Sequence, residues 1–166
     1  IPDGKDIMMV DQLLPPMNLK RYLRYFNNNI KVVIVDRDPR DVFILDKYVW
    51  KDGILPNDVE TFCKWYVYTR EHRKKENLDT NEIKFIRFED MIYQYDLTIK
   101  ELINWLGLDE KNHTKKKKIF KPSVSINNTQ MWKRYLGASE EVKIIEKRLA
   151  EYLYDYNKVS FLHKIT

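Results

Sequence analysis

The chain has 166 residues, of which 43% are hydrophobic, and its 30 basic and 25 acidic residues give a formal charge of +5. This composition is typical of one globular domain and excludes an intrinsically disordered chain. The single cysteine excludes an internal disulfide, and the modest positive charge favours an anionic ligand without requiring nucleic acid. No apolar run reaches the length of a membrane span and no signal peptide is recognised, so we expect a cytoplasmic location.

The first third of the chain predicts a helix, a strand and a second helix. Residues 18–28 carry apolar side chains at helical spacing. Residues 31–36 form a short run of mostly β-branched apolar side chains, typical of a strand covered on both faces, as in parallel sheets. Asp38 is a good N-cap and Pro39 a favoured first residue, so we expect a helix from Pro39 to about Trp50.

Two arginines lie where this strand meets this helix. Ligands of open α/β sheets bind at the carboxyl ends of strands, and the N-terminus of a helix attracts anions. Guanidinium groups donate hydrogen bonds in pairs that fit phosphate oxygens, so Arg37 and Arg40 predict a phosphate site. An alternative stays open, in which Asp36, Asp38 and Asp41 neutralise both arginines.

Further along, Asn57 or Asp58 is expected to cap a long helix, and residues 83–88 are typical of a second strand. Two strands separated by helices predict the α/β class. Two strands are too few for a complete sheet. We therefore expect residues 1–166 to form a single domain that is the C-terminal part of a larger one.

The C-terminal half is predicted to be rich in helix. Asp96 is expected to cap one helix, and Gly107 to end it as the C′ residue. The last helix is expected to begin at Ser139, with an apolar stripe that continues to Tyr156. The lysines between these helices, Lys115–Lys118, are interpreted as a solvated loop.

Four segments, in this order, resemble the sulfotransferases that use 3′-phosphoadenosine 5′-phosphosulfate (PAPS). Residues 35–42, Val-Asp-Arg-Asp-Pro-Arg-Asp-Val, resemble the 3′-phosphate motif of that family, and residues 85–91 are similar to its later strand and Glu-Asp turn. Residues 102–108 match its helix that ends in Leu-Gly. Residues 125–133 resemble the Ser-x-x-Asn-x-x-x-Trp-Lys segment of its glycan-directed and bacterial members.

This resemblance implies a P-loop-nucleotide-hydrolase-like parallel sheet flanked by helices. It also implies transfer of a sulfonate group from PAPS, without a metal, to a hydroxyl acceptor such as a saccharide. Asp11 is the one plausible general base in the corresponding window, although a capping role in its loop is an alternative and the true base could lie outside the chain. The resemblance assigns the cofactor cleft to Arg37, Arg40, Ser125, Asn127, Trp132 and Lys133.

The chain also departs from the family pattern. The family has a serine eight residues after the motif arginine, where this chain has Leu45, and either Arg40 or Lys47 is a substitute donor to the phosphate. No glycine-rich loop for the phosphosulfate occurs in the sequence. If the resemblance is true, that loop lies upstream of Ile1, and the chain alone is expected to be inactive.

Two other functions remain open. One is a nucleotide kinase-like phosphotransferase of related fold. The other is a non-catalytic module that binds a polyanion through Arg37, Arg40 and Lys115–Lys118. Glu89 and Asp90 are interpreted as a structural turn and helix cap, and the scattered histidines do not have the spacing of metal ligands.

Overall fold

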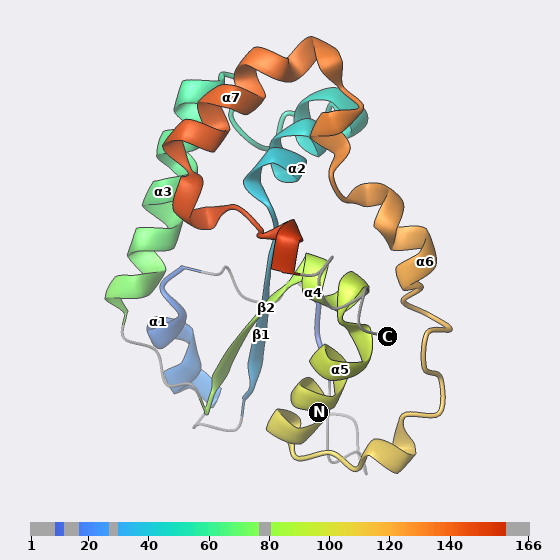
Figure 1. Cartoon of the computed structure of the whole chain (residues 1–166). Helices are drawn as coiled ribbons and strands as arrows, with labels where there is room; N and C mark the ends of the chain where they lie inside the picture. Colours follow the sequence, from blue (N-terminus) through green and yellow to red (C-terminus); the bar gives the residue numbers. More distant parts are fainter. Residues whose placement is uncertain (1–8, 12–16, 27–29, 77–80, 159–166) are drawn as a thin grey trace.

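The computed structural model describes residues 9–11, 17–26, 30–76 and 81–158 (Figure 1). The described residues contain two strands, β1 (Val32–Asp36) and β2 (Ile83–Arg87). The strands are parallel, with Val32 opposite Ile83 and Asp36 opposite Arg87, so both carboxyl ends lie at one edge. Helices connect the strands, which confirms the predicted α/β class.

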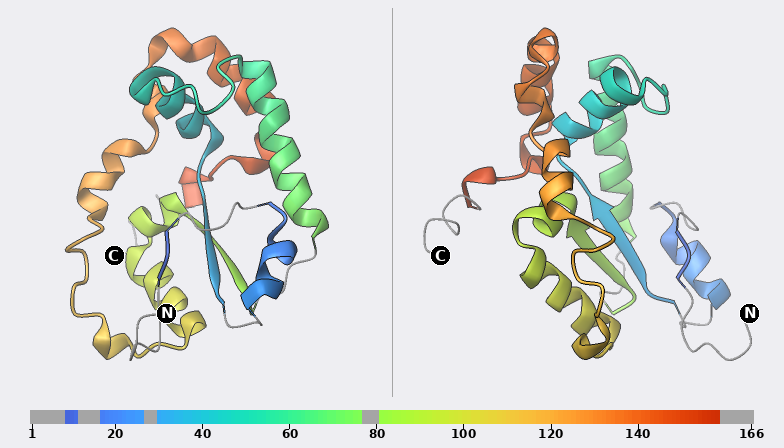
Figure 2. Two further views of the ribbon diagram at one scale, coloured as in Figure 1. Left: turned by 180° about the vertical axis from the view of Figure 1, so that it is seen from behind. Right: turned by 90° about the vertical axis from the view of Figure 1, so that its right-hand side faces the viewer.

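Helices lie on both sides of the strand pair. The two views of Figure 2 place α1 and α3 on one side and α4 and α5 on the other, with α7 crossing beyond the ends of the strands. The α-helices are α1 (Leu19–Leu23), α2 (Pro39–Ile44), α3 (Val59–Lys75), α4 (Phe88–Tyr93), α5 (Tyr95–Leu106), α6 (Pro122–Ser125) and α7 (Ser139–Arg148). The π-helix is η2 (Leu45–Trp50), and the short 3₁₀ turns are η1 (Arg24–Phe26), η3 (Glu110–Asn112), η4 (Ile126–Asn128), η5 (Met131–Lys133), η6 (Leu136–Ala138) and η7 (Ala150–Tyr152).

The turn from β1 into α2 forms as the sequence predicts. Pro39 is the first residue of α2, and the Asp38 carboxylate accepts a hydrogen bond from the Arg40 N–H at 2.9 Å. The helical run continues to Trp50, but from Leu45 onward it is a π-helix. The junction that carries both arginines is therefore a capped strand-to-helix turn.

Two other predicted caps are confirmed and one is wrong. Asp58 caps α3 by accepting from the Thr61 N–H at 2.8 Å, and Gly107 ends α5 in the left-handed region at φ 74°. Asp96, in contrast, lies inside the first turn of α5, which begins two residues earlier than a cap at Asp96 predicts. Its carboxylate pairs with nearby lysines of the basic run and is not used as a cap.

The last predicted helix is too long. α7 begins at Ser139 as expected but ends at Arg148. After η7 the chain runs back across the carboxyl ends of the strands, where the Tyr154 N–H donates to Asp38 Oδ2 at 3.1 Å (Figure 1). The apolar stripe continues to Tyr156 because these residues are also half-buried, but α7 ends before them and Tyr154 lies outside any helix.

The main core lies among helices and not on the sheet. Its fully buried members come from α2, α3, α7 and the residue after α7, and include Phe43, Phe62, Tyr66, Ile145 and Leu149. A smaller cluster packs α1 against the strands. The expectation that the first strand is covered on both faces is wrong for Val35, which is 51% exposed, because the helices cover only part of so narrow a sheet. Among the described residues, no helix is both long and apolar enough to cross a membrane.

Candidate functional site

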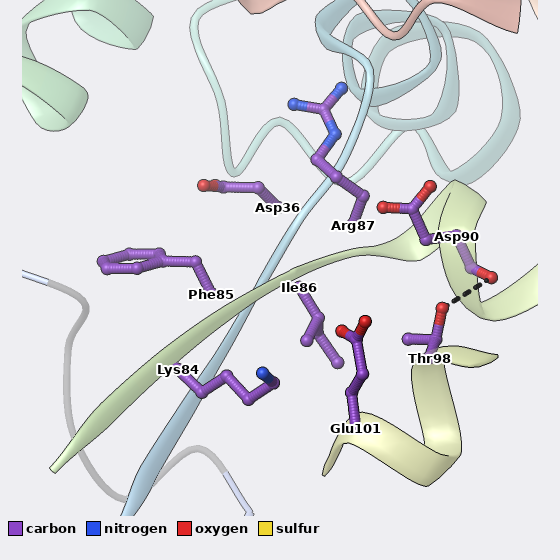
Figure 3. A pocket seen from close by; sticks show the side chains of 8 residues that line it. All are labelled: Asp36, Lys84, Phe85, Ile86, Arg87, Asp90, Thr98 and Glu101. Carbon is purple, nitrogen blue, oxygen red and sulfur yellow. Dashed lines mark hydrogen bonds between the residues drawn. The ribbon is translucent and has the colours of Figure 1, made fainter. Parts of the chain in front are cut away.

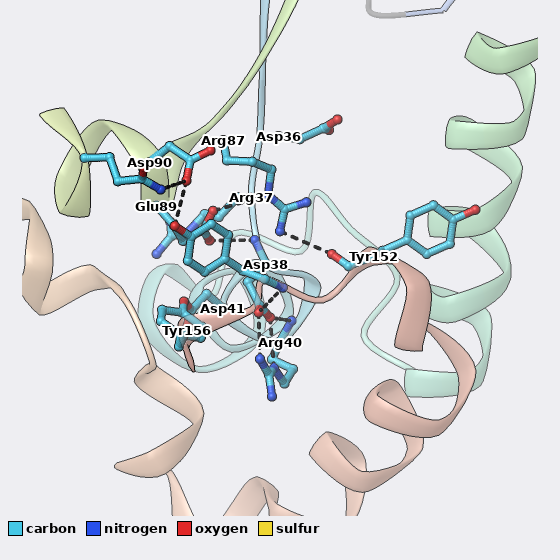
Figure 4. Close-up of polar contacts among 12 residues, drawn as sticks. Asp36, Arg37, Asp38, Arg40, Asp41, Arg87, Glu89, Asp90, Tyr152 and Tyr156 are labelled. Atoms are coloured by element: carbon cyan, nitrogen blue, oxygen red, sulfur yellow. Dashed lines mark hydrogen bonds and ion pairs between the residues drawn. The ribbon is translucent and has the colours of Figure 1, made fainter. Parts of the chain in front are cut away.

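β1 ends in Asp36, and the side chain of this residue turns away from the α2 junction. Figure 4 shows Asp36 pointing away from Arg37 and Arg40. Asp36 accepts from Arg70 at 3.1 Å and from Arg73 at 2.7 Å, both on α3. Charge-assisted bonds of this kind join the strand to the helix that covers it. The alternative in which Asp36 neutralises Arg37 and Arg40 is therefore wrong for Asp36.

Arg40 is buried and held by carboxylates. Its Nη2 donates to Asp38 Oδ2 at 2.7 Å and its Nε to Asp38 Oδ1 at 3.0 Å, which is the bidentate geometry of a strong ion pair. Nη1 donates to Glu146 of α7 at 2.7 Å, and the guanidinium lies 3.7 Å from the centre of the Trp132 ring. Asp38 therefore neutralises the charge of Arg40, as the alternative to a phosphate site had proposed.

Arg37 has a different environment. Its Nη2 donates to the backbone carbonyl of Asn128, and its guanidinium lies 4.7 Å from the centre of the Phe88 ring. Within the described ranges, Arg37 forms no ion pair, and its buried Nε has no hydrogen-bond partner. Burial lowers the pKa of Arg37, opposed by the charges of Asp41 and Glu89. Of the two arginines at this junction, the half-buried Arg37 is thus the one that has no carboxylate partner among the described residues.

The segment at residues 125–133 contacts both arginines of this junction, although only Trp132 does so through a side chain that was predicted to line the cleft. Its contact with Arg37 is made by the Asn128 carbonyl, and Trp132 stacks on Arg40. Ser125 is half-buried in α6, and the carbonyl of Asn127 accepts from Arg134. Lys133 is exposed and bonds to the nearby Gln130 side chain.

Asp41 is the third carboxylate at the junction and is completely buried. It accepts backbone hydrogen bonds from Met131 at 2.7 Å and from Gln130 at 3.0 Å. Burial raises the pKa of Asp41 to about 7, against the lowering effects of the Met131 bond and of Arg37. Asp41 therefore binds backbone groups and interacts with Arg37 only at longer range.

The end of β2 contributes residues that sequence reasoning did not assign to the site. Glu89 is fully buried and accepts from the Asp38 N–H at 2.7 Å, which joins the ends of the two strands. Arg87 lies 3.6 Å from Glu89, donates to the Tyr152 carbonyl at 3.2 Å and lies near the Tyr154 ring. The signal was available, because two predicted parallel strands that end in charged residues must place them at the same edge.

Three further predictions concern single residues. Leu45 is buried in the core, and Lys47 donates to Glu141 and to the Asn57 carbonyl, so neither faces a phosphate at Arg37. Asp11 is exposed, and among the described residues no hydrogen bond or ion pair joins it to Arg37. The role of Asp11 as a base therefore stays a prediction.

A shallow cavity of about 160 Å³ lies beside β2 and the start of α5 (Figure 3). It is smaller than the roughly 300–1,000 Å³ of most ligand pockets, and its wall mixes both signs of charge. Figure 3 shows that Lys84 and Glu101 approach it from β2 and α5. The cavity is lined by Asp36, Lys84, Phe85, Ile86, Arg87, Asp90, Thr98 and Glu101.

The fold and these side chains define an α/β protein with arginines at the carboxyl ends of parallel strands. The part of the chain that the structure describes contains no group of three or more histidine, cysteine or acidic side chains placed to hold a metal ion. No protein-family model matches the chain, and a search of curated proteins finds no match either.

Proposed function

We propose that this chain is a sulfotransferase-like domain that binds PAPS through Arg37 and directs its sulfonate group to a hydroxyl acceptor, a saccharide in the favoured case. In this proposal the strand pair belongs to a P-loop-nucleotide-hydrolase-like sheet. Arg37 binds the 3′-phosphate at the carboxyl end of β1, the edge at which ligands of open α/β sheets bind.

The contact between Arg37 and Asn128 is the observation that carries the proposal. It joins two segments 91 residues apart, and both belong to the set of motifs that resemble the sulfotransferase family. A chance likeness in two unrelated loops gives no reason for them to meet. Since Arg37 has no carboxylate partner among the described residues, its charge is available to an anion that approaches the strand ends.

Arg40 takes a structural part in this proposal. Asp38 and Glu146 already use three of its donors, so it positions the α2 turn beside the phosphate and does not bind the phosphate itself. Transfer of a sulfonate breaks the bond between sulfur and the bridging phosphate oxygen and forms one to the acceptor oxygen, whose proton goes to a base. Asp11 remains the predicted base.

Nucleotide titration tests the proposal. We expect adenosine 3′,5′-bisphosphate to bind more tightly than ATP or heparin in isothermal titration calorimetry. Arg37→Ala is expected to weaken bisphosphate binding at least tenfold, because a hydrogen bond to a charged group contributes about 1.5–3 kcal/mol. Arg148→Ala is the matched control, since Arg148 is exposed on α7 and pairs with Glu60 of α3.

The same titration separates the other functions. Tighter binding of ATP would favour the kinase-like phosphotransferase. Tighter binding of heparin, with a steep dependence on salt, would favour the polyanion module. Within the basic run, Lys116 and Lys117 pair with Asp96, which reduces the charge that this run offers to a polyanion. Unchanged bisphosphate affinity in Arg37→Ala would overturn the assignment of the site.

A further inference from the structure

We propose that Asp41 is a positioning residue that holds the Gln130–Lys133 turn against the carboxyl end of β1. Asp41 belongs to α2 and is completely buried, while the turn lies about 90 residues later in the chain. Both oxygens of the carboxylate are used, one by the Met131 N–H at 2.7 Å and the other by the Gln130 N–H at 3.0 Å.

These two hydrogen bonds give the turn a cap that its own sequence lacks. The first N–H groups of any helical turn have no acceptor within the turn. Gln130, at the N-cap of η5, provides no side-chain hydrogen bond to it and adopts a left-handed conformation with φ 52°. This region is uncommon for residues other than glycine. The turn therefore depends on Asp41, which supplies the missing acceptors from another element.

The position of the turn sets the position of the groups around both arginines. Trp132 lies in the second position of η5 and stacks on Arg40, and its ring centre is 5.5 Å from that of Tyr156. Asn128, two residues before Gln130, accepts the hydrogen bond from Arg37. If Asp41 released the turn, we would expect Trp132 to leave Arg40 and Asn128 to leave Arg37.

NMR spectroscopy of the full chain tests this role without any nucleotide. In the wild type, the ring current of Trp132 must shift the Arg40 guanidinium protons, and Trp132→Leu identifies that shift. Asp41→Asn places an amide NH₂ against backbone N–H donors, so we expect it to reduce the shift and to speed hydrogen exchange at Met131 about tenfold or more. Asp46→Asn is the matched control, because Asp46 is also a buried aspartate and accepts from the Leu55 N–H elsewhere.

A second readout depends on the proposed function. Through Arg37, Asp41→Asn is expected to weaken binding of adenosine 3′,5′-bisphosphate about tenfold, whereas Asp46→Asn leaves it unchanged. If no nucleotide binds even the wild type, the proposed function fails while the NMR result still decides the role of Asp41.

Three outcomes would overturn the role of Asp41. The first is an unchanged Arg40 shift and unchanged Met131 exchange in Asp41→Asn. The second is an equal effect of Asp46→Asn. The third is measured on the wild type and holds even if Asp41→Asn fails to fold: exchange of the Gln130 and Met131 amides at the rate of an unprotected chain would show that Asp41 does not hold them.

Discussion

Arg37 and Arg40 stand on either side of the Asp38–Pro39 turn, yet their environments are opposite. Arg40 lies inside the protein, with a bidentate bond to Asp38, a second carboxylate at Glu146 and an aromatic ring against its face. Arg37 has a backbone carbonyl, a ring and no carboxylate partner within the described residues. The comparison teaches that two arginines three residues apart can differ completely in their partners, one paired with two carboxylates and the other bound to a backbone carbonyl.

The largest effect that follows from this difference is on stability. Arg40→Ala should lower the free energy of unfolding by about 3–5 kcal/mol, because removal of one partner leaves a buried charge uncompensated. Asp38, the charge left behind, is fully buried. Urea denaturation measures the loss, and Arg148→Ala, which removes an exposed pair, should cost about 0.5 kcal/mol. If Arg40→Ala were as stable as the wild type, Arg40 would not have the structural role that its ion pairs indicate.

The next largest effect is the dependence of the free energy of unfolding on pH, to which Asp41 contributes. Burial raises its pKa in the folded protein to about 7 from the ordinary value of 3.8, so between these values the folded state binds a proton that the unfolded state has released. The contribution of Asp41 to stability is therefore present below about pH 4 and is lost as pH rises to about 7, by at most about 1.4 kcal/mol per pH unit.

The Asp41 prediction is measured as a difference between two proteins. Urea denaturation of the wild type and of Asp41→Asn at several pH values removes the common contribution of the other titrating groups. The stability of the wild type relative to the variant should fall between about pH 4 and 7. A difference that does not change with pH would mean that Asp41 ionises in the folded protein as readily as in water.

The smallest effect on stability should come from Arg37→Ala, the substitution that we expect to weaken binding of the bisphosphate. Arg37→Ala deletes one hydrogen bond to a carbonyl and one contact with Phe88. We expect the free energy of unfolding to fall by about 1 kcal/mol or less. A loss as large as that of Arg40→Ala would show that both arginines are structural, and the comparison between them would no longer hold.

Features of neighbouring residues in the sequence were enough to predict β1 and α2, the two elements that meet at the junction. The β-branched run, the Asp38 cap and Pro39 are all local features, and the structure confirms the strand, the turn and the helix from them. Gly107 and Asp58 were also predictable because a helix end needs a particular residue at one position.

The partners of the side chains could not be predicted in the same way. Arg37 and Arg40 have the same chemistry and the same aspartates nearby in sequence. Arg40 is distinguished by Glu146, which lies 106 residues later, and Arg37 by Asn128. The helical stripe that was extended to Tyr156 failed for a related reason, because the Asp38 carboxylate offers the Tyr154 N–H a partner outside any helix. Tertiary contacts decided both cases.

The separation in sequence between these partners has a consequence for folding kinetics. Asp38 meets Tyr154 across 116 residues, Arg40 meets Glu146 across 106 and Asp41 meets Met131 across 90. Closing such long loops costs entropy before any contact repays it, and contacts of this kind slow folding. A ribosome must therefore have synthesised the chain as far as Tyr154 before all of these contacts at the end of β1 can form.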